Sequence, residues 1–176
     1  MNVLIIGNGG REYSIGRALK NDKKVTSVTF APGNGATSNI GKNITISDFS
    51  QLATYAEENQ IDLTIVGPEA PLTEGIVAVF KEAGQTIFGP SKEAAQLEGS
   101  KVFMKNIFRK YSIPTADYIE TDIAQEAHDF IDTMSTPIVV KADGLCGGKG
   151  VIIATSHEQA KTTVNDMLSG SSFGDA

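Results

Sequence analysis

The chain has 176 residues, a formal net charge of −6 and a hydrophobic content of 40%, which is ordinary for a globular protein. Its lysines and acidic residues are mixed, so we expect no nucleic-acid partner, which would need a basic stripe. No run approaches the roughly 18 apolar residues of a membrane span, and the start lacks a signal peptide's basic segment. One cysteine excludes an internal disulfide, and we expect a cytoplasmic protein.

The first half of the chain alternates between strand-like and helix-like patterns. Short apolar runs predict strands at residues 3–6, 25–30, 44–46, 63–66 and 86–88. Helical spacing separates them: one helix follows Glu12, one follows Asp48, and one runs from Pro71 to Gly84. This alternation predicts an α/β fold with a parallel, doubly wound sheet, and such sheets bind ligands at the carboxyl ends of their strands.

Turns rich in glycine and proline follow three of these strands, at residues 7–12, 31–35 and 67–72. We expect all of them at the ligand-binding edge of the sheet. The first turn opens a helix, which suits a phosphate group, although a tight turn without a ligand remains the alternative. A dinucleotide site is disfavoured, because Glu12 stands where the fingerprint needs glycine or alanine and the second strand ends without an acidic residue.

The second half is dominated by helical patterns, at residues 94–97, 100–111, 123–134 and 156–170. In the second of these helices the predicted inner face carries Phe103, Ile107, Phe108 and Tyr111. Lys101, Lys105 and Arg109 recur at four-residue spacing, which most simply indicates a solvated face. Among the inward residues of the next helix we expect Ile123 and Ile131.

A glycine loop, residues 144–150, separates two short apolar runs, at residues 138–140 and 151–154. The runs predict a hairpin whose first strand is buried and ends at Lys141. The loop contains Lys149 and the glycines Gly144, Gly147, Gly148 and Gly150. Glycines let backbone N–H groups approach an anion, and lysine adds positive charge, so the pattern indicates a ligand that carries phosphate. The alternative is a hairpin loop without a ligand. It is not a P-loop, whose lysine is followed by serine or threonine and a helix.

The histidines and the cysteine of the chain do not indicate a metal site or a catalytic thiol. His128 and His157 have no cysteine or acidic partner at metal-ligand spacing, so we expect no metal site. Cys146 has no sequence context of histidine and acid that indicates a nucleophile, so we interpret it as a small side chain in the glycine loop.

Taken together, six blocks of sequence resemble the phosphoribosylamine–glycine ligases, also called glycinamide ribonucleotide synthetases, which are ATP-grasp ligases. The blocks occur in the family's order, and the closing residues 173–176 also match. They are residues 7–12, 31–34, 62–72, 88–90, 95–101 and 140–151.

The resemblance implies that ATP, glycine and 5-phosphoribosylamine give ADP, phosphate and glycinamide ribonucleotide through a glycyl phosphate, in purine biosynthesis. Residues 1–90 would form the amino-terminal substrate-binding domain. Residues 91–176 would begin the ATP-grasp domain, with linker helices at 91–116 and part of the nucleotide-binding subdomain at 117–176. We expect only these small-molecule partners and no obligate protein partner.

The resemblance also implies roles for individual residues. ATP binding falls to Lys105, Lys141, Gly144, Gly147, Gly148, Lys149 and Gly150. Binding of the phosphoribosyl substrate falls to Gly9, Gly10, Arg11, Glu12, Gly33, Asn34, Pro68 and Glu69. The catalytic residues and the ligands for Mg²⁺ or Mn²⁺ are expected beyond residue 176, because the family enzyme is more than twice as long.

Two substitutions depart from the family pattern: Tyr13 replaces its usual histidine, and Cys146 with Gly147 replaces two small residues. Neither changes the glycine pattern. We therefore expect an amino-terminal fragment of the ligase that is inactive by itself. The alternative is a stand-alone module that binds a nucleotide or phosphosugar without catalysis.

Overall fold

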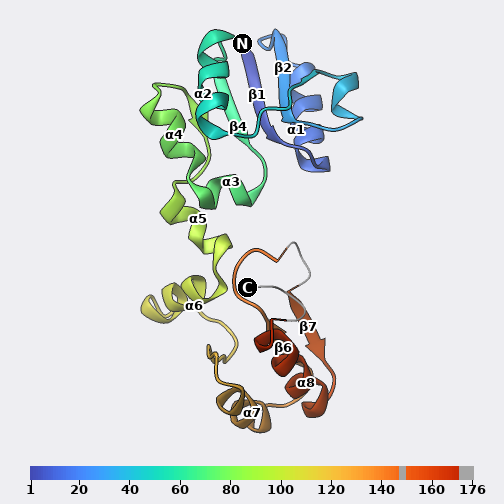
Figure 1. Ribbon diagram of the computed structural model, residues 1–176, viewed down its shortest axis with the longest axis vertical. Helices are drawn as coiled ribbons and strands as arrows, with labels where there is room; N and C mark the ends of the chain where they lie inside the picture. The colour runs from blue at the N-terminus through green and yellow to red at the C-terminus, as the bar shows by residue number, and fades with distance from the viewer. Residues whose placement is uncertain (147–149, 171–176) are drawn as a thin grey trace. The chain divides into compact units, whose positions relative to one another are not determined.

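A computed structural model describes residues 1–146 and 150–170 of the chain, which divides into two compact units, Met1–Gln96 and Leu97–Ala176 (Figure 1). We call them the amino-terminal and the carboxyl-terminal unit. The glycines Gly147 and Gly148, Lys149 and the closing residues 173–176 lie outside the described residues. Within the described part, no helix is long and apolar enough to cross a membrane.

The amino-terminal unit contains a five-stranded sheet in the order β3-β2-β1-β4-β5, and every pair of neighbours is parallel. The expected parallel α/β architecture is therefore confirmed. The strands are β1 (Asn2–Gly7), β2 (Ser27–Pro32), β3 (Lys42–Asn43), β4 (Leu63–Val66) and β5 (Ile87–Phe88). The third strand was expected at residues 44–46; instead Lys42 and Asn43 pair with β2, and Ile44 follows them into the core.

Helices cover both faces of this sheet, because its central strand β1 has apolar side chains on both. Leu4 and Ile6 face α2 and α4, whose contributions include Leu52 and Phe80. Val3 and Ile5 lie on the other face with Phe30, against α1. The helices are α1 (Gly10–Lys20), the 3-10 helix η1 (Thr37–Asn39), α2 (Phe49–Glu58), α3 (Glu69–Glu74), α4 (Ile76–Glu82) and α5 (Lys92–Gly99).

Two helices stand where the sequence predicted one from Pro71 to Gly84. Gly75 separates α3 from α4 with a backbone φ of +101°, a conformation that glycine adopts at little cost. Its N–H donates to the carbonyls of Pro71 and Leu72, which ends the first helix. The apolar pattern continues across this break, and for that reason periodicity alone did not reveal it.

The carboxyl-terminal unit contains a two-stranded antiparallel sheet and three helices that follow α5: α6 (Lys101–Lys110), α7 (Ala124–Thr133), β6 (Ile138–Lys141), β7 (Val151–Ala154) and α8 (His157–Leu168). The hairpin and its strand ends match the expectation. Serine caps begin two of the helices as predicted, since Ser100 accepts from Phe103 N and Ser156 from Gln159 N. A core that includes Ile131, Ile138 and Val164 joins α7 and α8 to the hairpin.

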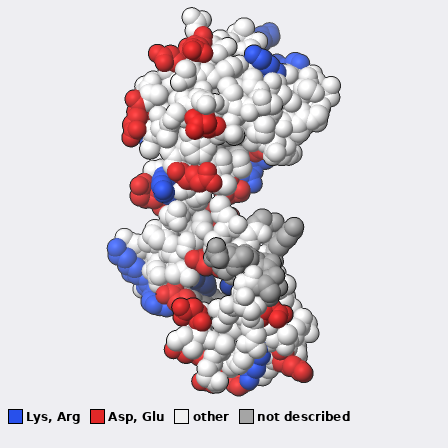
Figure 2. Space-filling model, in the orientation of Figure 1, with Lys and Arg blue, Asp and Glu red and all other residues white. Residues whose placement is uncertain are grey.

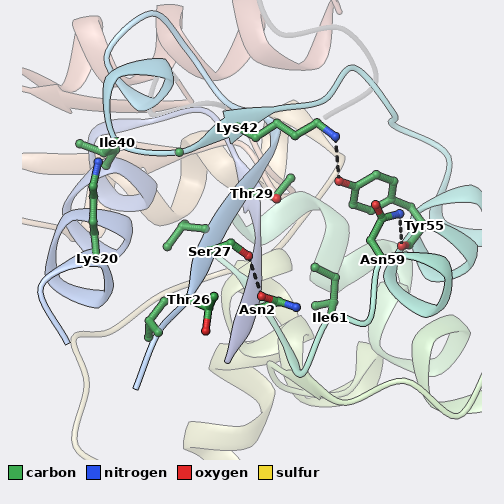
Figure 3. A pocket seen from close by; sticks show the side chains of 13 residues that line it. Asn2, Lys20, Thr26, Ser27, Thr29, Ile40, Lys42, Tyr55, Asn59 and Ile61 are labelled. Atoms are coloured by element: carbon green, nitrogen blue, oxygen red, sulfur yellow. Dashed lines mark hydrogen bonds between the residues drawn. The ribbon is translucent and has the colours of Figure 1, made fainter. Parts of the chain in front are cut away.

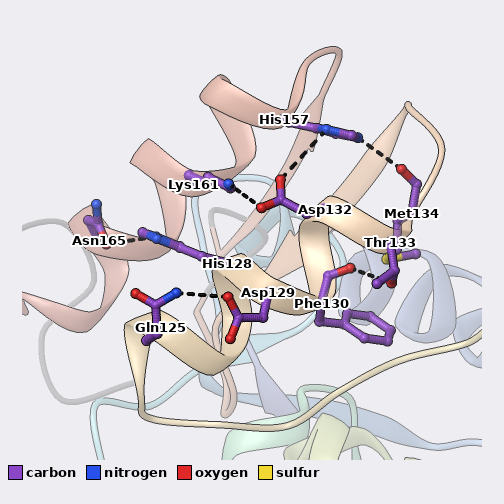
Figure 4. Close-up of polar contacts among 10 residues, drawn as sticks. All are labelled: Gln125, His128, Asp129, Phe130, Asp132, Thr133, Met134, His157, Lys161 and Asn165. Carbon is purple, nitrogen blue, oxygen red and sulfur yellow. Dashed lines mark hydrogen bonds and ion pairs between the residues drawn. The ribbon is translucent and has the colours of Figure 1, made fainter.

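Polar contacts at the surface join α7 to α8 (Figure 4). Lys161 Nζ lies 2.7 Å from the carboxylate of Asp132, and this hydrogen bond lowers the pKa of Asp132. His157 Nε2 lies 2.8 Å from the carbonyl oxygen of Met134 at the end of α7. His128 lies 3.1 Å from the side-chain oxygen of Asn165. Both histidines therefore have helix-packing contacts in this unit.

Some apolar side chains that were predicted to face inward are exposed. On α6, Phe103 is 38% exposed and Tyr111, at its end, is 62% exposed; Ile123 before α7 is 51% exposed. Val139 in the strand expected to be buried is 49% exposed. Periodicity identifies an apolar face but not the element that covers it, and nothing in the described part of the chain buries these side chains.

Substitution of Gly16 by alanine should destabilise the amino-terminal unit by about 1–3 kcal/mol, the usual cost of overpacking. A Cβ atom at this position of α1 would lie 2.3 Å from Cζ of Phe30, which is fully buried. Urea unfolding followed by circular dichroism measures the change. Gly35→Ala is the matched control, because a Cβ there meets no atom within 4 Å. Equal stabilities of the two variants would contradict the close packing of α1 on β2.

Candidate functional site

The three turns predicted to form a site lie together at the carboxyl edge of the parallel sheet. The register of β1 with its neighbours sets this arrangement, since Gly7 pairs with Pro32 and Ile6 with Val66. The strands therefore end at the same level, and residues 7–12, 31–35 and 67–72 follow them. We call this region the three-loop edge.

Backbone hydrogen bonds tie the three loops to one another. Gly33 N–H donates to the carbonyl of Gly7 over 3.1 Å, and Gly67 N–H donates to that of Ile6 over 3.1 Å. Asn34 adds a side-chain link, because its Nδ2 donates to the carbonyl of Asn8 over 2.7 Å. The same side chain accepts from the N–H groups of Ala36 and Thr37, which fixes its orientation.

Arg11 connects the first loop to the third. Its guanidinium donates to the carbonyl of Gly67 and lies 3.0 Å from the carboxylate of Glu69. The pKa of Glu69 is lowered, first by a hydrogen bond from its own backbone N–H at the start of α3 and then by Arg11. Glu69 therefore keeps its negative charge and holds Arg11 at this edge.

Glu12 is the one acidic residue among the buried polar residues of the described chain, with 4% exposure. It belongs to the first turn of α1, which begins at Gly10 rather than after Glu12 as the sequence suggested. Its carboxylate accepts from Gly9 N–H over 2.5 Å and fills the space beside Gly7 and Gly67. The carboxylate thus supports the loops from inside, while the amino end of α1 faces the edge with the positive end of its dipole.

Pro68 and the two glycines Gly9 and Gly10 complete the predicted set at this edge. Pro68 precedes α3, and its ring lies 2.9 Å from the position of a Cβ on Gly7. A Cβ on Gly10 would meet no atom within 4 Å, so this part of the turn leaves room for a ligand. The eight residues predicted to bind the phosphoribosyl substrate therefore come from three neighbouring loops.

A cavity of about 610 Å³ lies elsewhere in the same unit, at the starts of β1 and β2 (Figure 3). Its lining includes Asn2, Ser27 and, from other elements, Lys20, Lys42 and Tyr55. Lys42 Nζ lies 3.4 Å from the hydroxyl of Tyr55, which also lines the cavity (Figure 3). None of the predicted site residues lines this cavity, and the geometry of parallel sheets favours the opposite edge for ligands.

In the carboxyl-terminal unit, the β6–β7 hairpin presents an apolar face that ends in a cation. Val139 pairs with Ile153 and Lys141 pairs with Val151, so these four side chains share one face of the hairpin. Val139, Val151 and Ile153 are 49%, 42% and 62% exposed. We call this surface the hairpin face. The sequence pointed to Lys141, but both strands are continuous apolar runs, which gave no sign that Val139, Val151 and Ile153 are exposed.

Lys105 lies on α6 and contacts the segment that follows this helix. Its ammonium group lies 2.6 Å from Thr115 Oγ1 and 4.6 Å from the ring centre of Tyr118. Figure 2 shows basic side chains gathered over α6, which carries Lys101, Lys105, Arg109 and Lys110. Of the other residues predicted to bind ATP, Gly144 and Gly150 lie next to the hairpin, and the remaining three lie outside the described residues.

Groups of three or more histidine, cysteine, aspartate or glutamate side chains that could hold a metal ion do not occur among residues 1–146 and 150–170. Cys146 is a free thiol in this range, 3.6 Å from the carbonyl oxygen of Asp143.

Substitution of Gly67 by alanine should destabilise the amino-terminal unit by about 2 kcal/mol, comparable to a lost hydrogen bond to a charged group. A Cβ there would lie 1.9 Å from Oε1 of Glu12, so the carboxylate must move away from Gly9 N–H. In a Glu12→Ala background the same substitution should cost much less, because the obstacle is gone. Urea unfolding of the four chains completes this cycle, and additive costs would show that Glu12 does not support the third loop.

Comparison with known proteins divides the chain close to the boundary between the two structural units, which follows Gln96. The N domain of phosphoribosylglycinamide synthetase matches residues 1–98, and the ATP-grasp (A) domain of the same enzyme matches residues 99–176. The phosphoribosylamine–glycine ligase of Haemophilus influenzae is 49% identical over 180 residues, which cover 100% of this chain and 42% of that protein. The chain thus spans less than half the length of this curated relative.

Solved structures show the same similarity. A crystal structure of phosphoribosylamine–glycine ligase from Thermotoga maritima has a TM-score of 0.80 and 32% identity, and the match covers 100% of this chain and 41% of that one. The biotin carboxylase domain of a Hydrogenobacter thermophilus 2-oxoglutarate carboxylase, solved with MgADP, has a TM-score of 0.70 at 19% identity and shares the fold over 98% of this chain and 42% of its own. Since the two domain matches together cover all 176 residues, the chain belongs to the phosphoribosylglycinamide synthetase family.

Proposed function

We propose that this chain supplies the phosphoribosyl-binding part and one side of the ATP site of a phosphoribosylamine–glycine ligase. The observation that carries the proposal is the hairpin face, where Lys141 follows exposed apolar residues and stands beside the glycine loop. An apolar surface suits a nucleotide base, and a lysine at its end suits the phosphates.

The reaction proceeds in two balanced steps. A carboxylate oxygen of glycine attacks the γ-phosphorus of ATP, which gives glycyl phosphate and releases ADP. The amino group of 5-phosphoribosylamine then attacks the acyl carbon, and inorganic phosphate leaves with the formation of glycinamide ribonucleotide. This route replaces a poor electrophile by a good one, so the protein contributes mainly positioning and charge neutralisation.

In this proposal the three-loop edge binds the phosphoribosyl substrate. The amino terminus of α1 offers N–H groups to the phosphate, and the first turn leaves space at Gly10. Arg11 and Asn34 keep the loops in register, and the buried carboxylate of Glu12 supports them from below. Gly9, Gly33, Pro68 and Glu69 shape the same edge.

ATP binding involves the hairpin face, the glycine loop and Lys105. Lys141, Lys149 and Lys105 would neutralise phosphate charge, and Gly144, Gly147, Gly148 and Gly150 would let the backbone approach it. The present contacts of the Lys105 ammonium group are a neutral hydroxyl, a carbonyl and the Tyr118 ring, and a phosphate is a stronger acceptor than these. Mg²⁺ or Mn²⁺ would be held by carboxylates supplied from outside this chain and would neutralise phosphate charge. The enzyme would be cytoplasmic.

Lys141→Ala in the ligase that contains this chain should lower kcat/KM for ATP. The loss should correspond to about 2 kcal/mol of transition-state stabilisation, as for a lost hydrogen bond to a charged group. Stability should change little, because the side chain is exposed. Steady-state kinetics over a range of ATP concentrations measures the effect. Lys110→Ala, an exposed lysine of the same unit, is the control. Unchanged ATP kinetics for Lys141→Ala would remove this lysine from the site.

The 176-residue chain by itself should not form glycinamide ribonucleotide, because the ligands for the metal are expected outside it. Phosphate release with ATP, glycine and freshly prepared phosphoribosylamine tests this expectation, and the ligase that contains the chain should release phosphate only when all three substrates are present. Turnover by the isolated chain would mean that its residues include the catalytic set. Binding of ATP or phosphosugar without turnover by the longer protein would instead favour a binding module.

A further inference from the structure

Asp143 occupies the junction between β6 and the glycine loop, and its carboxylate is bonded to the first turn of α6. Oδ1 accepts from the backbone N–H groups of Lys101 over 2.6 Å and Val102 over 3.2 Å. Oδ2 accepts from the hydroxyl of Ser100, the residue that caps α6, over 3.0 Å. Residues more than 40 positions apart in the sequence are therefore joined by one side chain.

Reciprocal contacts extend this junction into the loop. Lys101 Nζ donates to the carbonyl of Gly144 over 2.8 Å, so the first residue of α6 holds the residue after Asp143. Ala142 N–H donates to the carbonyl of Gly150 over 2.9 Å, which closes the base of the loop on its other side. The Cys146 thiol lies 3.6 Å from the carbonyl of Asp143 and 3.8 Å from that of Gly144.

The carboxylate of Asp143 is suited to hold such a junction. Partial burial opposes its ionisation, but hydrogen bonds from Val102, Ser100, Gly144 and Lys101 outweigh this effect and lower its pKa. Its charge also lies at the positive end of the α6 dipole. Hydrogen bonds to an ionised acceptor are stronger than neutral ones, so the bonds to the helix are of the strong kind.

We propose that Asp143 is a positioning residue that clamps residues 143–146, where the chain passes from β6 into the glycine loop, onto the first turn of α6. The clamp fixes where the loop leaves β6 relative to the helix that carries Lys105. The clamp itself is independent of any ligand, whereas its consequence for ATP rests on the proposed function.

Cys146 provides a specific probe of the clamp, because it is the only cysteine of the chain and lies within the clamped segment. Alkylation of this thiol by iodoacetamide, without nucleotide, should be at least about tenfold faster in Asp143→Asn than in the parent chain, because the loss of one charge-assisted hydrogen bond changes an opening equilibrium by roughly this factor. Lys101→Met should raise the rate by a smaller factor, about threefold, since it removes a single bond to a carbonyl.

Asp48→Asn is the matched control. The carboxylate of Asp48 also accepts from a backbone N–H in the first turn of a helix, that of Gln51 in α2, but Asp48 belongs to the other unit. Cys146 in the Asp48→Asn variant should be alkylated at the same rate as in the parent chain. Urea unfolding is measured for each variant, so that a general loss of structure is recognised. If Asp143→Asn does not fold, the alkylation rate of Lys101→Met decides the test. Unchanged alkylation in the folded variants would overturn the clamp.

The consequence for the reaction is measured separately in the ligase that contains this chain. Asp143→Asn should raise KM for ATP by about tenfold and leave KM for glycine unchanged, because the loop is displaced and the amino-acid site is not. Faster alkylation with unchanged ATP kinetics would overturn the positioning role. A parent ligase without activity would contradict the proposed function instead, and the alkylation result would still decide whether the clamp exists.

Discussion

The parallel pairing of β1 with both of its neighbours is the constraint on which the rest of the amino-terminal unit depends. It brings the ends of β1, β2 and β4 to one level, so three loops from distant parts of the sequence meet at one edge. Arg11 and Asn34 then connect these loops by hydrogen bonds to backbone carbonyls, and the Glu12 carboxylate packs between Gly9 and Gly67. These contacts hold the loops in one arrangement without a ligand, and such preorganisation would reduce the entropic cost of the proposed binding.

In the proposed function, the two units would bind phosphate groups by different means. At the three-loop edge a helix terminus and closely spaced backbone provide the favourable environment, with one arginine whose charge is balanced by Glu69. In the carboxyl-terminal unit lysines carry the positive charge, at the end of the hairpin face, in the glycine loop and on α6. Both arrangements place positive electrostatic potential locally on a chain whose net charge is −6, as the proposed binding of anionic substrates requires.

Glu12 and Asp143 illustrate a shared use of carboxylates. Neither belongs to a group of potential metal ligands among the described residues. Glu12 accepts from the backbone N–H of Gly9, and Asp143, which precedes Gly144, accepts from those of Lys101 and Val102. A carboxylate has two acceptor oxygens, so it can accept from several donors at once, and its charge strengthens these hydrogen bonds. In both units an acidic side chain therefore accepts hydrogen bonds from the backbone close to a glycine-rich turn or loop.

The sequence by itself determined the parallel α/β class, the hairpin around the glycine loop and the two serine caps, because these depend on local periodicity and on short-range hydrogen bonds. Resemblance in ordered blocks also indicated the family. Only the tertiary structure decided that Glu12 points inward, that α3 and α4 separate at Gly75, that Val139 and Ile153 are exposed, and that Asp143 reaches α6. These features depend on which distant element lies beside a residue, and spacing along the chain carries no information about that neighbour.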